Sequence, residues 1–537
     1  MYDLVIKNGF IIDGSENAKP FMGDIAVKNG VIAAITPVIN ENAANTVDAA
    51  GKTVTPGFID IHRHCDAAVF RPHFGEIELR QGITTIINGN CGLSIAPCPP
   101  QWKEDILQYL KPITGSLPAP PNEPVFSSFS EYMSSLKNLN LPINFGSFVG
   151  NGTLRMAATG FGSAPLTQKD YAGIRHDLQD ALEAGCFGVS MGLIYMPECM
   201  YTIAEITQAL APIRGRGIPL IAHIRGEGNM LVQSLEEVIA IARELDAPLH
   251  ISHFKCVGRQ NWGHLLKQAM DLIEEAAAQG MTITCDCYPW TAGSTQLIQL
   301  LPPEYLEGGI SQTVERLKDY GQRHRCAGIM EKPQNHYENL IPLVGWENIM
   351  ITALESPENQ QYVGMRVTEI AQAKGVDPYI CAFDLLVEEN CNVSIVNFIA
   401  CEEDITTILR YPRSCIISDS LYPDSGRPHP RQFGTFPKII EDYVIKQRIL
   451  TLAQAVYKMT GGPAKVLGIP GKGLLQKGMD ADIIVFDPKA VRCNADYTSP
   501  DNLATGFSYV FIKGVLVNAG DEIVYTNVGS VLRRFSN

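Results

Sequence analysis

Hydrophobic residues recur through the middle of the chain in short runs, separated by polar loops and amphipathic stretches. Most runs precede a segment with helical periodicity; in 231–245, for example, Glu236, Glu237 and Arg243 are expected to face solvent. This alternation predicts parallel strands connected by helices. The predicted strands are 58–62, 84–88, 144–149, 188–193, 220–224, 249–253, 282–287 and 415–418.

Eight such units are typical of a (β/α)8 TIM-type barrel. A doubly wound open sheet would give a similar pattern, but it has no reason to carry ligand-type residues at the ends of so many strands. A long gap separates the seventh and eighth strands. We expect an insertion at about 292–385, a lid or small subdomain, in which 314–320 is a candidate helix.

The two ends of the chain have a different pattern, typical of short antiparallel strands. Asn8-Gly9 and Asn29-Gly30 are hairpin-type turns between apolar runs, and 509–518 resembles a further hairpin. We predict that both ends build one small β-sandwich outside the barrel. The expected domains are therefore 1–56 and 466–537, which together form the sandwich, and 57–465, which forms the barrel.

Composition narrows the class of protein. The chain has 537 residues, 45% of them hydrophobic and 19% charged, with a net charge of −14. This charge argues against nucleic acid or an anionic membrane as the main partner. No apolar run has the length of a membrane span, and no secretory signal opens the chain. The 14 irregularly spaced cysteines fit a reducing cytoplasm. The sequence does not predict an oligomeric state.

Ligand-type residues stand where several predicted strands end. His62 and His64 are two apart and would share a face. Cys91 closes the second strand, as a buried thiol or as a metal ligand. His223 closes the fifth strand. His253 closes the sixth and is favoured over His250, which has the opposite parity.

Other residues allow more than one interpretation. Asp419, after the eighth strand, is a metal ligand, a general base or a turn aspartate. Arg431 on its own is a solvated loop arginine. The remaining notable cysteines are expected to be core thiols, including Cys285 and Cys287, which share a face of the seventh strand. They are Cys186, Cys285, Cys287, Cys401 and Cys415.

Several motifs make a resemblance specific. The start, Pro56-Gly57-Phe58-Ile59-Asp60-Ile61-His62-x-His64, and the end, Gly478-x-Asp480-Ala481-Asp482-Ile483, resemble the amidohydrolase superfamily. Five further motifs resemble its N-acyl-D-amino-acid deacylases (D-aminoacylases). These are 89–92 (GNCG), 223–227 (HIRGE), 252–255 (SHxK), 288–295 (YPxxAGST) and 427–431 (RPHPR). The similarity covers nearly the whole chain and is weakest at 296–410.

The resemblance implies one tightly held Zn²⁺ on Cys91, His223 and His253. The cysteine would replace the carboxylated lysine of hydantoinases and dihydroorotases, and no lysine occurs in 188–195. The resemblance also implies a weaker second metal site at His62 and His64, with Asp419 near both.

The implied reaction is hydrolysis of an N-acyl-D-amino acid by zinc-activated water, with Asp419 as general base and acid. Arg431 would bind the carboxylate of this small-molecule substrate, and Tyr195 and Ser294 would line the pocket. A cyclic-amide hydrolase resembling hydantoinase or dihydroorotase is one alternative, and a non-catalytic scaffold is another. The preferences for side chain and acyl group are not predicted.

The chain departs from the family pattern at three positions. Arg63 stands between the first two histidines, where a small residue is usual. Cys65 replaces the more usual Asp or Ser and adds a thiol that could compete for metal. Ser420 follows Asp419 in place of Gly or Ala. None of the departures removes a catalytic group, but they leave the occupancy of the second metal site open.

Overall fold

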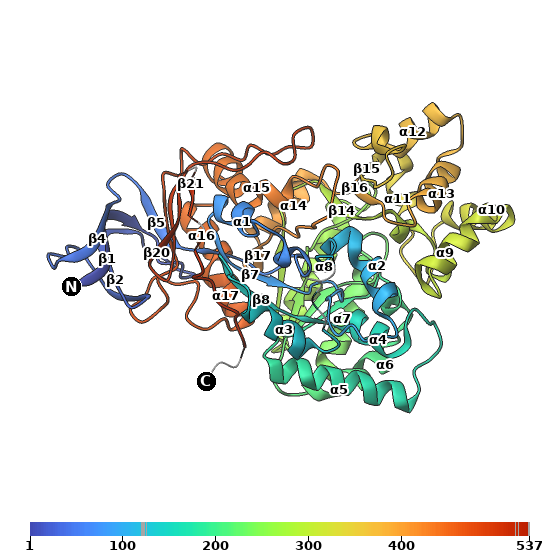
Figure 1. Cartoon of the computed structure of the whole chain (residues 1–537), viewed down its shortest axis with the longest axis horizontal. Helices are drawn as coiled ribbons and strands as arrows, with labels where there is room; N and C mark the ends of the chain where they lie inside the picture. The colour runs from blue at the N-terminus through green and yellow to red at the C-terminus, as the bar shows by residue number, and fades with distance from the viewer. Residues whose placement is uncertain (120–123, 125, 521, 525, 535–537) are drawn as a thin grey trace.

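The computed structural model describes residues 1–119, 124, 126–520, 522–524 and 526–534. Strands from both chain ends lie together at one end of the molecule, as Figure 1 shows. Alternating strands and helices fill the middle, and the segment 292–398 forms the opposite end.

The central strands form two parallel sheets. One has the order β6-β7-β8 and the other the order β17-β13-β12-β11-β10-β9. The predicted strands are all present, with ends that differ by at most two residues, except that Phe148 splits 144–149 into β8 and β9. The bounds are β6 (Phe58–Asp60), β7 (Ile83–Asn88), β8 (Asn144–Ser147), β9 (Val149–Gly150), β10 (Val189–Gly192), β11 (Leu220–His223), β12 (Leu249–Ile251), β13 (Ile283–Cys287) and β17 (Ser414–Ile416).

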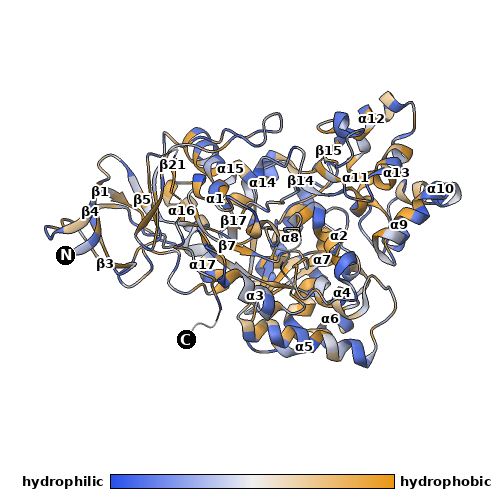
Figure 2. Ribbon diagram, viewed as in Figure 1, coloured by the Kyte–Doolittle hydropathy of each residue, from blue (hydrophilic) through white to orange (hydrophobic). Residues whose placement is uncertain are grey.

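Amphipathic helices cover these strands. The helix predicted at 231–245 is confirmed as α7, with Glu236 and Arg243 exposed; Glu237 is less exposed than predicted because it pairs with Arg225 at 2.8 Å. Helix α5 likewise alternates between hydrophobic and hydrophilic residues (Figure 2). The helices are α1 (Glu76–Arg80), α2 (Lys103–Thr114), α3 (Phe129–Lys137), α4 (Asn151–Thr159), α5 (Gln168–Ala184), α6 (Ile203–Ala209), α7 (Leu231–Glu244), α8 (His264–Ala278), α14 (Glu402–Arg410), α15 (Arg431–Lys438), α16 (Leu452–Met459) and α17 (Gly461–Leu467).

Both chain ends contribute to one nine-stranded sheet, as predicted. Its order is β21-β20-β19-β18-β5-β1-β2-β3, with β4 also paired to β1. Leu4, Val54 and Ile483 belong to one buried cluster, so the two ends share a core. The strands are β1 (Tyr2–Ile11), β2 (Phe21–Lys28), β3 (Val31–Thr36), β4 (Ala43–Asp48), β5 (Thr53–Pro56), β18 (Ile483–Phe486), β19 (Phe507–Ile512), β20 (Val515–Ala519) and β21 (Glu522–Ile523).

One of the predicted turns in this sheet is wrong. Asn8-Gly9 does not reverse the chain; β1 runs through it with a bulge, where Asn8 takes a φ of +59°. The pairing of β1 with β2 continues on both sides of the bulge. Asn29-Gly30, in contrast, connects β2 to β3 as predicted.

The insertion has its own small antiparallel sheet, β14-β16-β15, and continues to Phe398, beyond the predicted 385. The helix predicted at 314–320 is confirmed over 314–318, as part of α9, but its end is wrong because Asp319 ends that helix: its carboxylate accepts the Gln322 backbone N–H at 2.8 Å and starts a new helix. The domain limits stay a prediction. The bounds are β14 (Ala292–Gln296), β15 (Ile349–Ala353), β16 (Ser394–Phe398), α9 (Gly309–Lys318), α10 (Tyr320–Met330), α11 (Ile341–Val344), α12 (Val367–Lys374) and α13 (Pro378–Glu388).

Candidate metal centre and substrate pocket

The candidate ligands meet where the central strands end. His62 and His64 follow β6, Cys91 follows β7, and His223 is the last residue of β11. His253 and Asp419 follow β12 and β17, and all six side chains are buried.

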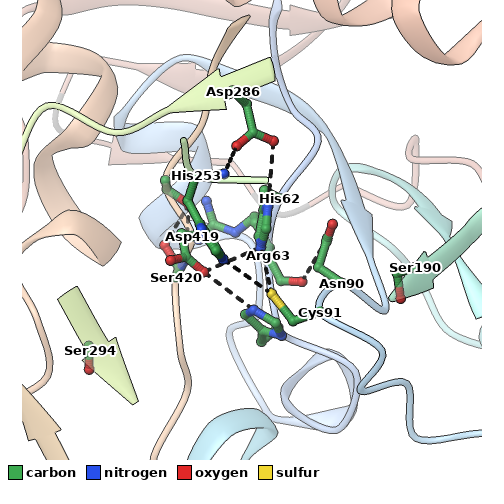
Figure 3. A network of polar contacts seen from close by, with 12 residues as sticks. His62, Arg63, Asn90, Cys91, Ser190, His253, Asp286, Ser294, Asp419 and Ser420 are labelled. Atoms are coloured by element: carbon green, nitrogen blue, oxygen red, sulfur yellow. Dashed lines mark hydrogen bonds and ion pairs between the residues drawn. The ribbon is translucent and has the colours of Figure 1, made fainter. Parts of the chain in front are cut away.

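The sulfur of Cys91 points between two histidines, as Figure 3 shows. It lies 3.3 Å from His62 Nε2 and 3.5 Å from His253 Nε2. Cys91, His253 and Asp419 have φ values of +55°, +34° and +53°. Non-glycine residues rarely adopt this left-handed region, and such strain concentrates at functional sites. The backbone thus turns sharply at three of the six candidate residues.

Three groups of side chains have ligand atoms within 4.8 Å of one another. They are His62, Cys91 and His253; His62, His64 and Asp419; and His223, Glu227 and His253. The second group coincides with the predicted weaker site. In it, Asp419 Oδ1 lies 3.4 Å from His62 Nε2 and 3.3 Å from His64 Nε2. The first group shares His62 with the second and His253 with the third, so the three groups form one connected set of candidate ligands.

The protonation states suit metal ligation. Burial alone would raise the pKa of Cys91, but the charge of His62 and contacts with neighbouring histidines hold it well below its usual range, as a thiolate. Burial and His253 lower the pKa of His223, which favours the neutral ring. Both His223 ring nitrogens are buried without a hydrogen-bond partner among the described residues. A neutral imidazole with free nitrogens beside a thiolate fits a soft divalent cation such as zinc.

Three charged residues of the site were missed by the sequence reasoning. Glu227 Oε1 lies 3.0 Å from His253 Nδ1 and 2.6 Å from Lys255 Nζ. Asp286 Oδ2 lies 3.5 Å from His62 Nδ1, and its Oδ1 accepts the His253 backbone N–H. Glu227 and Lys255 belong to the motifs that follow β11 and β12, and their place in those motifs could have identified them. Such partners orient ligands.

The predicted substrate-binding residues also meet here. Arg431 Nη1 lies 2.8 Å from Asp419 Oδ2, and its Nη2 donates to the Ser294 carbonyl at 3.3 Å. The Ser294 hydroxyl itself donates to the Ile395 carbonyl at 2.9 Å. The Tyr195 ring lies 5.0 Å from that of His223. All three residues line one pocket that opens to solvent, and Ser294 belongs to the insertion.

Most cysteines outside the site are buried thiols. Cys65 Sγ lies 2.9 Å from Asn88 Oδ1, and burial raises its pKa well above the usual value, so it stays protonated. It joins none of the ligand groups of the described residues. The predicted competition for metal is therefore not supported. The five predicted core thiols are likewise absent from these groups. Cys186, Cys285, Cys287 and Cys415 are buried as predicted, but the prediction is wrong for Cys401, which precedes α14 and is partly exposed. No described helix has both the length and the apolar character that crossing a membrane requires.

Comparisons with known proteins point to one family. A sequence model of the Amidohydrolase family matches residues 413–518. The chain is 32% identical to a D-aminoacylase of Alcaligenes xylosoxydans xylosoxydans, over 99% of this chain and 98% of that protein. It resembles the crystal structure of an N-acyl-D-glutamate deacylase from Bordetella bronchiseptica, complexed with zinc and a phosphonate inhibitor. The TM-score is 0.83 with 31% identity, and the match covers 99% of each chain.

A further similar structure was determined to define the functional role of a binuclear metal centre in D-aminoacylase. It has a TM-score of 0.81 and 30% identity over 99% of this chain and all of that one. Identity of this level over the whole length decides the family. The chain belongs to the N-acyl-D-amino-acid deacylase (D-aminoacylase) family of amidohydrolases.

Proposed function

We propose that this protein is a zinc-dependent hydrolase that cleaves N-acyl-D-amino acids to a carboxylate and a free D-amino acid. The position of Asp419 carries the proposal. One carboxylate oxygen lies 3.3 Å from His64 Nε2 and the other lies 2.8 Å from Arg431 Nη1. A base, candidate ligands and a carboxylate-binding cation thus share one pocket. The activities named for the similar proteins support the same reaction class.

The buried donors fit zinc. We assign the tight site to Cys91, His223 and His253, because a thiolate and two imidazoles are preferred zinc ligands. The weaker second site is assigned to His62, His64 and Asp419, whose ligand atoms lie within 4.8 Å of one another. Bound zinc would lower the pKa of a water molecule and polarise the amide carbonyl.

The chain's own residues supply the proton transfers and the orientation. Burial would raise the pKa of Asp419, but Arg431 and His62 hold it well below its usual range, so the carboxylate is ready to accept a proton. Asp419 would take the proton of the attacking water and return it to the leaving amine. Arg431 would bind the substrate carboxylate through its planar fork. Tyr195 and Ser294 would complete the walls.

We also infer that the two parallel sheets close into one (β/α)8 barrel, with a β-sandwich of both chain ends outside it. Arg63 forms a parallel bridge to Ser420, which connects the end of β6 to the end of β17. The Asp419 N–H donates to the His62 carbonyl at 2.9 Å, and the His64 N–H donates to the Ser420 carbonyl at 3.0 Å. Only Phe148 separates β8 from β9. These contacts support closure. The core that both chain ends share supports a separate unit of 1–56 and 466–537, outside a barrel of 57–465.

Two alternatives have less support. A cyclic-amide hydrolase would be expected to carry a ligating lysine at the end of β10, and 188–195 has none. A non-catalytic scaffold would be expected to lack ligands or the base, whereas the six candidate residues are buried and adjacent.

The test is zinc content measured together with hydrolysis of N-acetyl amino acids, D and L side by side. Wild type is compared with Cys91→Ala and with a control, Cys401→Ala, whose thiol lies outside the ligand groups of the described residues. We expect about one tightly held zinc per chain and D-selective release, both lost only in Cys91→Ala. Zinc without D-selective release would refute the substrate assignment. Absence of zinc in wild type would refute the metal site.

A further inference from the structure

Most of the pocket wall is apolar. The apolar residues follow different central strands or belong to the insertion, so they surround the space beside the candidate ligands. They are Leu93, Ile113, Ile194, Val257, Leu340, Ile399 and Leu421. Five of these seven side chains are fully buried in the protein, and only Ile194 and Leu340 are partly exposed. A fixed wall of this kind favours an apolar substrate group.

Only two lysine or arginine side chains are among the described residues that line this pocket, Lys255 and Arg431. Lys255 Nζ already donates to Glu227 Oε1 at 2.6 Å and to the His253 carbonyl at 3.0 Å. Arg431 is the cation assigned to the α-carboxylate of the substrate. Neither cation is therefore left for a second carboxylate on the substrate.

The wall also carries a negative charge of its own. Glu338, from the insertion, lines the pocket beside Leu340. Its Oε2 accepts the backbone N–H groups of Gly228 at 2.8 Å and Met230 at 3.2 Å, which fix the carboxylate in place. A carboxylate on the substrate side chain would meet this group and an apolar surface, without a lysine or arginine of the pocket left to pair with it.

We infer that the pocket selects N-acyl-D-amino acids with an uncharged, apolar side chain, and discriminates against D-aspartate and D-glutamate derivatives. The inference rests on the proposed function, because it uses Arg431 as the α-carboxylate site. It separates this chain from the similar protein named as an N-acyl-D-glutamate deacylase.

A second cavity adjoins the pocket and is an alternative place for an acidic side chain. Ile194, Gln299 and Glu338 line both spaces. Arg225 and Arg325 line the second cavity only. Arg225 is held by Glu237 at 2.8 Å, but Arg325 is exposed and could receive an acidic side chain that reached this far.

The experiment compares kcat/KM of the zinc-loaded enzyme for the N-acetyl derivatives of D-leucine, D-methionine, D-aspartate and D-glutamate, with L-leucine as the stereochemical reference. We expect the D-leucine and D-methionine derivatives to exceed the acidic ones by about 100-fold or more, since a buried unpaired charge is rejected more strongly than a change in size. An equal or higher value for D-glutamate would overturn the inference and leave the proposed function intact. No hydrolysis of any D derivative would overturn both.

Variants test which residues produce the selectivity between apolar and acidic side chains. Glu338→Gln removes the charge and keeps an acceptor for the two backbone N–H groups. We expect it to raise kcat/KM for the D-glutamate derivative about fivefold or more, so that the leucine-to-glutamate ratio falls. Glu304→Gln is the matched control, because Glu304 is exposed and lines only the second cavity. An unchanged ratio in a folded Glu338→Gln, or glutamate activity that is lost in Arg325→Ala, would overturn the assignment.

Discussion

Arg431 Nη1 lies 2.8 Å from Asp419 Oδ2, and both side chains are buried. The cation proposed to bind the substrate therefore also neutralises the proposed base. With His62, it keeps the pKa of Asp419 well below the usual range although burial alone would raise it. A substrate carboxylate would share the Arg431 guanidinium with Asp419. Binding of the substrate is therefore expected to alter the pKa of Asp419.

Arg431→Lys tests this shared role. Lysine keeps the charge, but a point charge cannot replace the planar fork that reaches both Asp419 and the Ser294 carbonyl. Loss of a buried charge-pair contact costs about 2–5 kcal/mol, so we expect kcat/KM to fall by roughly 30-fold or more, with a higher KM. Steady-state kinetics on an N-acetyl-D-amino acid would measure it.

The matched control is Arg427→Lys, since Arg427 is an exposed arginine four residues earlier. It should leave both kinetic constants near those of wild type. If Arg431→Lys keeps kcat/KM within about threefold, Arg431 does not bind the substrate carboxylate.

Asp286→Asn tests the support of the candidate ligands. Asp286 Oδ2 lies 2.9 Å from His250 Nε2 and 3.5 Å from His62 Nδ1, while Oδ1 accepts the His253 N–H. Loss of such a partner lowers metal affinity by about 10–100-fold. We expect that decrease in a competition titration of zinc against a chelator. Asp404→Asn, a buried carboxylate that caps Gly263 in another part of the fold, should change affinity little. Equal affinities in the two variants would contradict the role.

Much of the site was predictable because ligand-type residues at the ends of parallel strands meet at one edge. His62, Cys91, His253 and Asp419 were identified in this way, and their atoms lie together. Asp286 was missed because it points to the opposite face of β13 from its two neighbours. Attention fell on Cys285 and Cys287, which share one face of β13, whereas the residue between them points the other way, to His62. Alternate residues of a strand lie on opposite faces, so a charged residue between two apolar ones could have indicated a polar contact on the other face.

The insertion and the first turn show the limits of local patterns. Residues 292–398 form short elements whose boundaries depend on caps such as Asp319 rather than on a long apolar repeat. Asn8-Gly9 has the composition of a hairpin turn, but β1 pairs with β2 on both sides of it. The pairing of β1 with β2 determines that this dipeptide forms a bulge rather than a turn. The dipeptide sequence alone does not distinguish the two.

Arg63, one of the three residues that depart from the family pattern, is expected to contribute to the stability. Its guanidinium is fully buried and donates to Asp60 Oδ2 at 3.0 Å, to Glu78 Oε1 at 2.6 Å and to the Tyr422 hydroxyl at 3.0 Å. Arg63→Met would leave two buried carboxylates unpaired, which costs about 3–5 kcal/mol. The urea midpoint should fall accordingly.

A surface arginine provides the comparison for Arg63. Arg71 pairs with Asp424, and both side chains are about one-third exposed. Arg71→Met should cost less than about 1 kcal/mol, because water screens the pair. A midpoint for Arg63→Met no lower than that for Arg71→Met would show that the buried network contributes nothing beyond an ordinary surface pair.

Glu198 predicts a pH-dependent stability away from the ligands. It is buried, and its two carboxylate oxygens accept the Asn151 side-chain N–H at 2.7 Å and the Gly192 N–H at 2.8 Å. Burial raises its pKa from 4.5 to about 7, although Asn151 and Gly192 oppose the shift. Between these two values the folded chain binds more protons than the unfolded one. The free energy of unfolding therefore falls as pH rises through this window, by about 3 kcal/mol in total.

Glu198→Gln should remove that loss. Asn151 Oδ1 is buried without a hydrogen-bond partner among the described residues. If the Asn151 amide rotates, this oxygen can accept a hydrogen bond from the side-chain N–H of the new glutamine. The glutamine oxygen would still accept the Gly192 N–H, as Glu198 does. Relative to wild type, the variant should gain stability as pH rises from 5 to 8, measured as urea midpoints at each pH. A difference that stays constant over this range would mean that Glu198 does not change its protonation differently in the folded and unfolded chains.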